Sequence, residues 1–142
     1  MDATTEFILD NSVAMVWGFD DEADPYAESL LDLMPTARAY VPTLWPLEVA
    51  NVLLVGERRK RITPADTAAF LALLGTFPIT VDDETTVRAW SETLSLARAQ
   101  GLSVYDAAYL ELAMRRGLPL ATLDDKLKAA AQAVGVSLYP TS

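Results

Sequence analysis

The segment Phe7-Ile8-Leu9-Asp10 consists of three large apolar residues followed at once by an acid. An apolar run this short, without alternating polar residues, is typical of a strand buried in a parallel sheet. Similar runs occur at residues 38–41, 78–81, 118–122 and 136–138, and longer stretches with helical spacing separate them. The alternation predicts an α/β fold, a three-layer α/β/α domain with a central parallel sheet of about five strands.

Local signals mark where several of the intervening helices begin. Asp24 before Pro25 is typical of an N-cap followed by the first residue of a helix. Thr63-Pro64-Ala65-Asp66 has the spacing of a capping box. Helices are predicted over residues 14–19, 25–34, 46 to about 60, 64 to about 75, from Asp82 or Asp83 to Gly101, from Ser103 to Gly117, and after the fourth strand to about residue 134.

Length and composition predict one folded domain over residues 1–142, because 51% of the residues are hydrophobic. No uncharged apolar run approaches the roughly 20 residues that span a bilayer. The polar, acidic start does not have the pattern of a secretory signal. We therefore expect a soluble cytoplasmic protein with no membrane contact.

The chain contains no histidine and no cysteine. Hydrolases of the Ser-His-Asp and Cys-His types need an imidazole base, so both are excluded. Histidine-ligated or cysteine-ligated zinc is excluded as well. Any chemistry must therefore use oxygen ligands, for which Mg²⁺ and Mn²⁺ are the suitable cations.

The formal net charge is −9, and residues 1–57 carry almost all of the acidic excess, with 11 acids and one base. This charge argues against a protein that binds nucleic acid mainly by releasing counterions. The acids between Asp20 and Asp32 are interpreted as a solvated surface at the start of a helix. The basic run Arg58, Arg59, Lys60 and Arg61 is a weaker candidate for RNA contact, since cations also complement the end of a helix.

Four acids lie where an apolar segment ends or a helix begins: Asp10, Glu48, Asp106 and Asp124. The carboxyl ends of parallel strands meet at one edge of a sheet, where open α/β sheets bind ligands. Asp10 ends the first strand and Asp124 follows the fourth, so both belong to this edge. Glu48 and Asp106 are in the first turns of helices, and we expect them to face the same edge.

Each acid also has a simpler explanation when taken alone. Ser103 and Asp106 match a capping box, Asp124 suits an N-cap, and Glu48 suits a first helical turn. Asp10 is different, because an acid directly after a buried strand is itself partly buried and needs a partner. These explanations are compatible with a shared site.

The residues around the four acids resemble the signature segments of PIN-domain proteins, and more narrowly those of the VapC toxin ribonucleases of toxin–antitoxin pairs. The segments that carry the resemblance are Leu9-Asp10-Asn11-Ser12-Val13-Ala14, Pro46-Leu47-Glu48-Val49-Ala50-Asn51, Tyr105-Asp106-Ala107-Ala108-Tyr109-Leu110 and Ala121-Thr122-Leu123-Asp124. They occur in the right order and cover nearly the whole chain.

The resemblance implies a PIN-like fold and a ribonuclease that uses Mg²⁺ or Mn²⁺. It assigns the four acids to the metal site and makes Ser12, Asn51 and Thr122 supporting polar residues. Asp125 leaves open which of two adjacent acids faces the metal, and we take Asp124. The resemblance also implies an RNA substrate, a VapB-like antitoxin as partner, and a homodimer.

The three tryptophans are candidates for stacking on bases or for contact with a partner. Trp90 has core spacing with Val87 and Leu94, so it is predicted to be buried. Trp45, close to Glu48, is the better candidate for partner contact.

Two other functions remain possible from the residues alone. One is a magnesium-dependent phosphotransfer or phosphoacceptor domain, although none of the three lysines ends a predicted strand. The other is a binding module that keeps the fold without catalysis.

Overall fold

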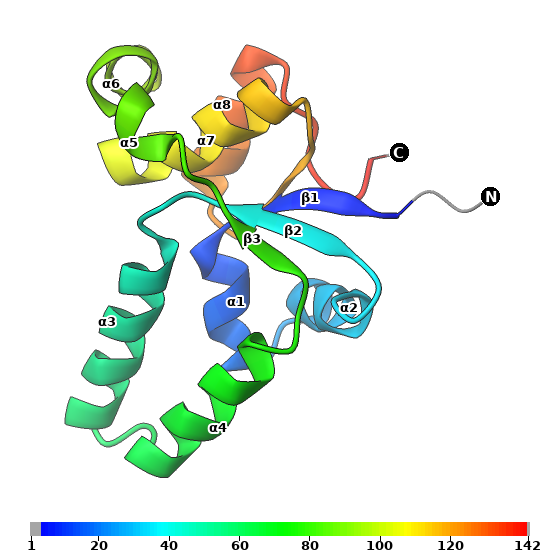
Figure 1. Cartoon of the computed structure of the whole chain (residues 1–142), viewed down its shortest axis with the longest axis vertical. Coiled ribbons are helices and arrows are strands. Elements are labelled where there is room, and N and C mark those ends of the chain that lie inside the picture. The colour runs from blue at the N-terminus through cyan, green and yellow to red at the C-terminus, as the bar shows by residue number, and fades with distance from the viewer. Residues whose placement is uncertain (1–3, 142) are drawn as a thin grey trace.

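The computed structural model describes residues 4–141 and contains four parallel strands in the order β3-β2-β1-β4 (Figure 1). The strands are β1 (Glu6–Leu9), β2 (Arg38–Val41), β3 (Ile79–Val81) and β4 (Leu120–Ala121). The helices are α1 (Asn11–Trp17), α2 (Pro25–Leu33), α3 (Trp45–Arg58), α4 (Pro64–Leu74), α5 (Thr85–Arg88), the π-helical turn η1 (Ala89–Thr93), α6 (Leu94–Gln100), α7 (Val104–Arg116) and α8 (Asp125–Val134).

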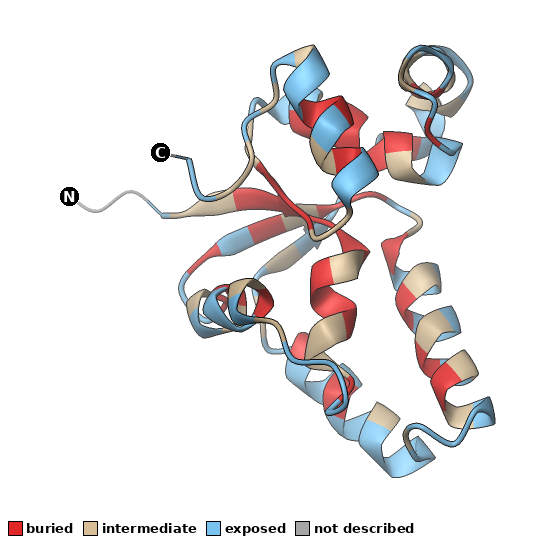
Figure 2. Ribbon diagram, turned by 180° about the vertical axis from the view of Figure 1, so that it is seen from behind, coloured by how far each residue is buried: buried red, intermediate tan, exposed pale blue. Residues whose placement is uncertain are grey.

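The three-layer α/β/α architecture is confirmed. Helices α1 to α4 lie on one side of the sheet, and α5 to α8 lie on the other (Figure 1). Buried residues run through the strands and through the helix faces turned toward them (Figure 2). β1 is the centre of this core, because Phe7, Ile8 and Leu9 are all fully buried. Among residues 4–141, no helix is long and apolar enough to cross a bilayer.

The sheet has four strands where about five were predicted. Residues 136–138 form only a single parallel bridge, between Leu138 and Leu120. β4 itself pairs with β1 over two residues, so it offers little length for a further strand.

Several predicted helix ends are confirmed by their capping bonds. The side chain of Asp24 accepts a hydrogen bond from the backbone of Ala27, and Thr63 with Asp66 forms a complete capping box. Ser103 caps α7, and Gly117 ends it with a φ of 64°, in the left-handed region that glycine tolerates best.

The predicted helix from Asp82 or Asp83 to Gly101 is wrong in its start and in its regularity. Neither acid is its N-cap, because helix α5 begins at Thr85 after Glu84. The π-turn η1 then inserts one residue, which rotates the preceding turn by about 100° relative to α6. Val87 and Trp90 therefore face solvent, and 93% of Trp90 is exposed instead of buried.

The expectation for Trp45 is also wrong. Only 7% of this residue is exposed. It lines the same pocket as Leu74 and Phe77, which follow it in α4 and in the loop before β3. Trp45 thus belongs to the hydrophobic core, which the sequence next to Glu48 did not reveal.

The chain order creates one place where neighbouring connections diverge. β1 continues into α1 on one side of the sheet, whereas its neighbour β4 continues into α8 on the other (Figure 1). Such a divergence at the carboxyl ends of adjacent parallel strands is where open α/β folds bind ligands. Asp10 follows β1 directly, and Thr122 follows β4 directly.

A buried ion network ties α7 to the end of β3. Arg115 of α7 donates two hydrogen bonds to Asp82, at 2.8 and 3.0 Å, and two to Glu111, at 2.9 and 3.0 Å. Thr85 also donates to Asp82 at 2.8 Å and accepts from the backbone of Thr43, just before α3. The network therefore joins the two helices that carry Glu48 and Asp106.

Replacing Arg115 with methionine should lower the free energy of unfolding by about 3–5 kcal/mol, because two buried carboxylates lose their cation. Burial raises the pKa of Asp82, but the bonds from Arg115 and Thr85 outweigh it, and the pKa lies below its ordinary value. The stabilisation is therefore present at neutral pH and is lost as the pH falls through this lowered pKa. Urea unfolding at pH 7 and at lower pH measures both effects.

The matched control is Arg88→Met, which removes surface ion pairs to Glu84 and Glu92 at 3.5 and 3.6 Å. This change should cost less than about 1 kcal/mol. Equal losses for the two variants would contradict a special role for the buried network.

Candidate functional site

Asp10 is the most buried of the four candidate acids, with 5% of the residue exposed. Ser12 and Thr122 both donate hydrogen bonds to its Oδ2, at 2.6 and 2.7 Å. Burial raises the pKa of Asp10 above its ordinary value, and these bonds only partly oppose that effect. The charge of Asp106 raises the pKa further. A buried carboxylate is thus held in place close to another negative charge.

Thr122 and Ser12 connect the two strand ends as well as orienting Asp10. The hydroxyl of Thr122 accepts a hydrogen bond from the backbone of Asp124 at 3.0 Å. The hydroxyl of Ser12 accepts one from the backbone of Leu123, also at 3.0 Å. The loop that carries Asp124 is therefore fixed to the end of β1.

Glu48 lies half-buried in the first turn of α3. The hydroxyl of Tyr109 donates a hydrogen bond to its Oε1 at 2.5 Å. Burial raises the pKa of Glu48, the Tyr109 bond lowers it in part, and the charges of Asp10 and Asp106 raise it again. The Tyr109 bond fixes one oxygen of this carboxylate, and the charges of two of the other acids act on it.

Asp106 lies in the first turn of α7, where the Ser103 hydroxyl accepts a hydrogen bond from its backbone at 3.0 Å. Burial raises the pKa of its carboxyl, and the charge of Asp124 raises it further. The charge of Asp124 thus raises the pKa of Asp106, and the charge of Asp106 raises the pKa of Asp10 and of Glu48.

Asp124 is the N-cap of α8, and its Oδ1 accepts hydrogen bonds from the backbones of Lys126 and Leu127 at 2.8 and 3.1 Å. Both cap bonds use one oxygen, so the capping role leaves Oδ2 for another interaction. The neighbouring side chain of Asp125 is 98% exposed and lies 3.8 Å from Lys128. Of the two adjacent acids, Asp124 is the one whose charge acts on Asp106.

The structure thus brings the four predicted acids to one edge of the sheet. The charge of Asp124 acts on Asp106, that of Asp106 acts on Asp10 and Glu48, and that of Asp10 acts on Glu48. No three of the four have carboxylate oxygens within 4.8 Å of one another. Among residues 4–141, no lysine or arginine forms an ion pair with any of the four. The charge of Lys126 lowers the pKa of Asp106 in part, but no cationic side chain in the described part of the chain pairs directly with the four acids. Carboxylate oxygens in such surroundings are what Mg²⁺ and Mn²⁺ bind, so the residues fit such a cation.

Of the other predicted residues, Ser12 and Thr122 lie at this edge, whereas Asn51 and the basic run lie farther from it. Asn51 is exposed, one turn along α3 from Glu48. The basic run follows at the opposite end of α3, about 15 Å from Glu48 at 1.5 Å per residue. Arg61 is already engaged there, since it pairs with Asp21 at 2.8 Å and stacks over Phe19 at 4.2 Å.

Tyr109 belongs to the site and was not singled out from the sequence. Its position three residues after Asp106 places both side chains on one face of α7. That spacing is the sequence signal that could have identified it. The structure adds that Tyr109 is fully buried, so its hydroxyl needs a hydrogen-bond partner.

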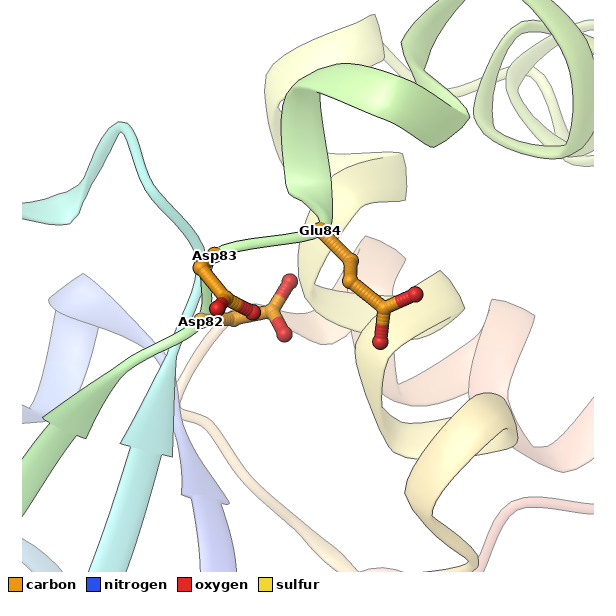
Figure 3. Close-up of side chains that lie close together, drawn as sticks. All are labelled: Asp82, Asp83 and Glu84. Atoms are coloured by element: carbon orange, nitrogen blue, oxygen red, sulfur yellow. The ribbon is translucent and has the colours of Figure 1, made fainter.

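A second acidic group lies outside the predicted site. Asp82, Asp83 and Glu84 gather between β3 and α5, with carboxylate oxygens within 4.8 Å of one another (Figure 3). Arg115 already pairs with Asp82 and, at 3.3 Å, with Glu84. The guanidinium group thus supplies the positive charge here, and the group is better explained as part of the ion network.

Comparisons with known proteins identify the family. The sequence profile of the PIN domain matches residues 7–133, which is most of the chain. The chain belongs to the PIN domain family. A search of curated protein sequences finds no match.

Solved structures of similar fold support the PIN architecture. PAE2754 from Pyrobaculum aerophilum has a TM-score of 0.64 and 24% identity, covering 90% of this chain and 87% of its own. VapC20 from Mycobacterium tuberculosis, described as a sarcin-ricin loop cleaving toxin, has a TM-score of 0.60 and 18% identity, with coverage of 87% and 94%. FitAcB from Neisseria gonorrhoeae has a TM-score of 0.59 and 19% identity, with coverage of 94% and 96%. At these identities the likeness concerns the fold.

Changing Asp10 to asparagine should stabilise the PIN domain in the presence of a chelator, by about 1 kcal/mol or roughly 3–5 °C in Tm. The change removes a buried charge and its repulsion from Asp106, while the amide oxygen still accepts the bonds from Ser12 and Thr122. Urea unfolding without divalent cations measures the effect. Asp124→Asn keeps its cap and should change stability by less than about 0.5 kcal/mol. A clear loss of stability in Asp10→Asn would show that the charge is not strained in the folded protein.

Proposed function

We propose that this PIN-domain protein is a metal-dependent endoribonuclease and the toxin of a toxin–antitoxin pair. The observation that carries the proposal is the convergence of Asp10, Glu48, Asp106 and Asp124 at the β1–β4 divergence, with no ion-pair partner among residues 4–141. The family match and the fold shared with VapC20, a sarcin-ricin loop cleaving toxin, favour RNA as the substrate.

The four carboxylates would hold Mg²⁺ or Mn²⁺. Such a cation supplies an activated water and positive charge that offsets the charge of the phosphate. Without it, the carboxylates would repel the RNA backbone. The protein's own contribution is to keep its ligands in place before the substrate arrives, as Ser12 and Thr122 do for Asp10.

RNA must also be bound beside the scissile phosphate. Arg58, Arg59 and Lys60 are exposed, but they lie at the far end of α3 from Glu48. They would therefore contact phosphates distant from the cleaved bond. Because the chain is strongly acidic, we expect its affinity for RNA to be modest until the cation is bound. The protein would also bind a VapB-like antitoxin and form a homodimer.

Purified protein incubated with structured RNA should cleave it in Mg²⁺ or Mn²⁺ and not in excess chelator. Asp10→Asn and Asp124→Asn should each lower the rate at least ~100-fold, since metal-ion catalysis contributes several kcal/mol. Asp125→Asn is the matched control, because Asp125 is adjacent to Asp124 but points to solvent. Its activity should remain within about twofold of the wild type, because surface substitutions away from a site have small effects.

Full cleavage in chelator would rule out the metal role. Activity that survives in Asp10→Asn protein would remove Asp10 from the site. Metal binding without cleavage of any RNA would instead identify a PIN-domain binding module.

A further inference from the structure

The hydroxyl group of Tyr109 joins two helices of the site. Tyr109 belongs to α7, and its hydroxyl donates to Glu48 of α3 at 2.5 Å. These two helices lie on opposite sides of the sheet (Figure 1). The bond therefore connects the first turn of α3 with the face of α7 that carries Asp106.

The surroundings of Tyr109 keep its hydroxyl a donor. The side chain is fully buried. Burial raises the pKa of Tyr109 far above its ordinary value, and the bond to Glu48 and the charges of Glu48 and Asp10 raise it further. The phenol is therefore the donor in this bond, and its proton points to Glu48.

A buried tyrosine needs a hydrogen-bond partner. Here the partner is a carboxylate that is not confined to this position by burial. Glu48 is only half-buried and has a flexible side chain, so it could turn outward to water. Repulsion from Asp10 and Asp106 favours that outward movement. The bond to Tyr109 opposes it and keeps the carboxylate among like charges, which is a strained place for it unless a cation binds there.

We propose that Tyr109 is a positioning residue that holds the Glu48 carboxylate in the orientation from which it binds the divalent cation. Tyr109 uses Oε1, and Oε2 remains for the cation. The inference rests on the proposed metal site but assigns a separate task to a residue outside the four acids. Hydrogen-bond partners of ligand carboxylates commonly change metal affinity by roughly 10–100-fold when they are removed.

The test is Mn²⁺ affinity of the full chain, measured by the electron paramagnetic resonance signal of free Mn²⁺. Tyr109→Phe keeps the ring and should weaken Mn²⁺ binding roughly tenfold. It should shift Tm by no more than about 5 °C. Tyr40→Phe is the matched control, because Tyr40 also donates to a carboxylate, Glu6 Oε2 at 2.7 Å, at the other end of β1. Its Mn²⁺ affinity should equal that of the wild type.

A double-mutant cycle separates positioning from general damage. If Tyr109 acts through Glu48, Tyr109→Phe should cause no further loss of Mn²⁺ affinity in a Glu48→Gln background. Glu48→Asp provides a second route, because the shorter side chain keeps its charge but cannot keep the bond. It should weaken Mn²⁺ binding at least as much as Tyr109→Phe.

The inference would be overturned if the Tyr109→Phe protein bound Mn²⁺ as tightly as the wild type. If Tyr109→Phe does not fold, wild-type Mn²⁺ affinity in Glu48→Asp would overturn it instead. It would also be overturned if Tyr109→Phe weakened Mn²⁺ binding in the Glu48→Gln background as much as it does in the wild type. If Asp10→Asn abolishes Mn²⁺ binding while Tyr109→Phe does not alter it, only the inference fails. If Asp10→Asn and Glu48→Gln also bind Mn²⁺ normally, or if the wild type binds none, the proposed metal site fails with it.

Discussion

The buried carboxylate of Asp10 is the constraint on which the site depends. It lies at the end of the central strand, where burying a charge is costly unless an opposite charge or several hydrogen bonds compensate. The hydroxyls of Ser12 and Thr122 compensate in part and also fix the loop that carries Asp124. Burial nevertheless raises the pKa of Asp10 above its ordinary value. A divalent cation between Asp10 and its acidic neighbours is the simplest source of the missing positive charge.

The fold contains an instructive contrast at the end of β3. Asp82 follows that strand as Asp10 follows β1, and it is also buried. Its pKa is nevertheless below its ordinary value, because Arg115 and Thr85 bond to it. Two strand ends of one sheet thus carry buried acids, and the protein itself neutralises only the outer one. The uncompensated acid lies at β1, where the connections of adjacent strands diverge and a ligand can enter.

Much of this could be predicted from the sequence, because buried strands, capping boxes and the placement of the acids are local patterns. The three-layer fold and four of the strands followed from them. The placement of the four acids predicted one shared edge, and the resemblance to PIN-domain proteins supplied their proposed role. The exposure of Trp90 could not be predicted from the sequence, because the π-turn that shifts its register leaves no local signal. The fifth strand was overestimated because residues 136–138 have strand-like composition but only one bridge to β4. Glu48, the partner of Tyr109, and Asp82, one partner of Arg115, come from distant segments, and only the packed structure shows them.

A crystal structure of the protein with Mn²⁺, in which anomalous scattering locates the cation, would test whether the Asp10 carboxylate binds metal. We expect a Mn²⁺ peak among the carboxylates of Asp10, Glu48, Asp106 and Asp124, and none at Asp82, where Arg115 supplies the positive charge. A peak at the β3–α5 turn with nothing beside Asp10 would contradict this expectation, because the buried charge of Asp10 would then have no role in binding the cation.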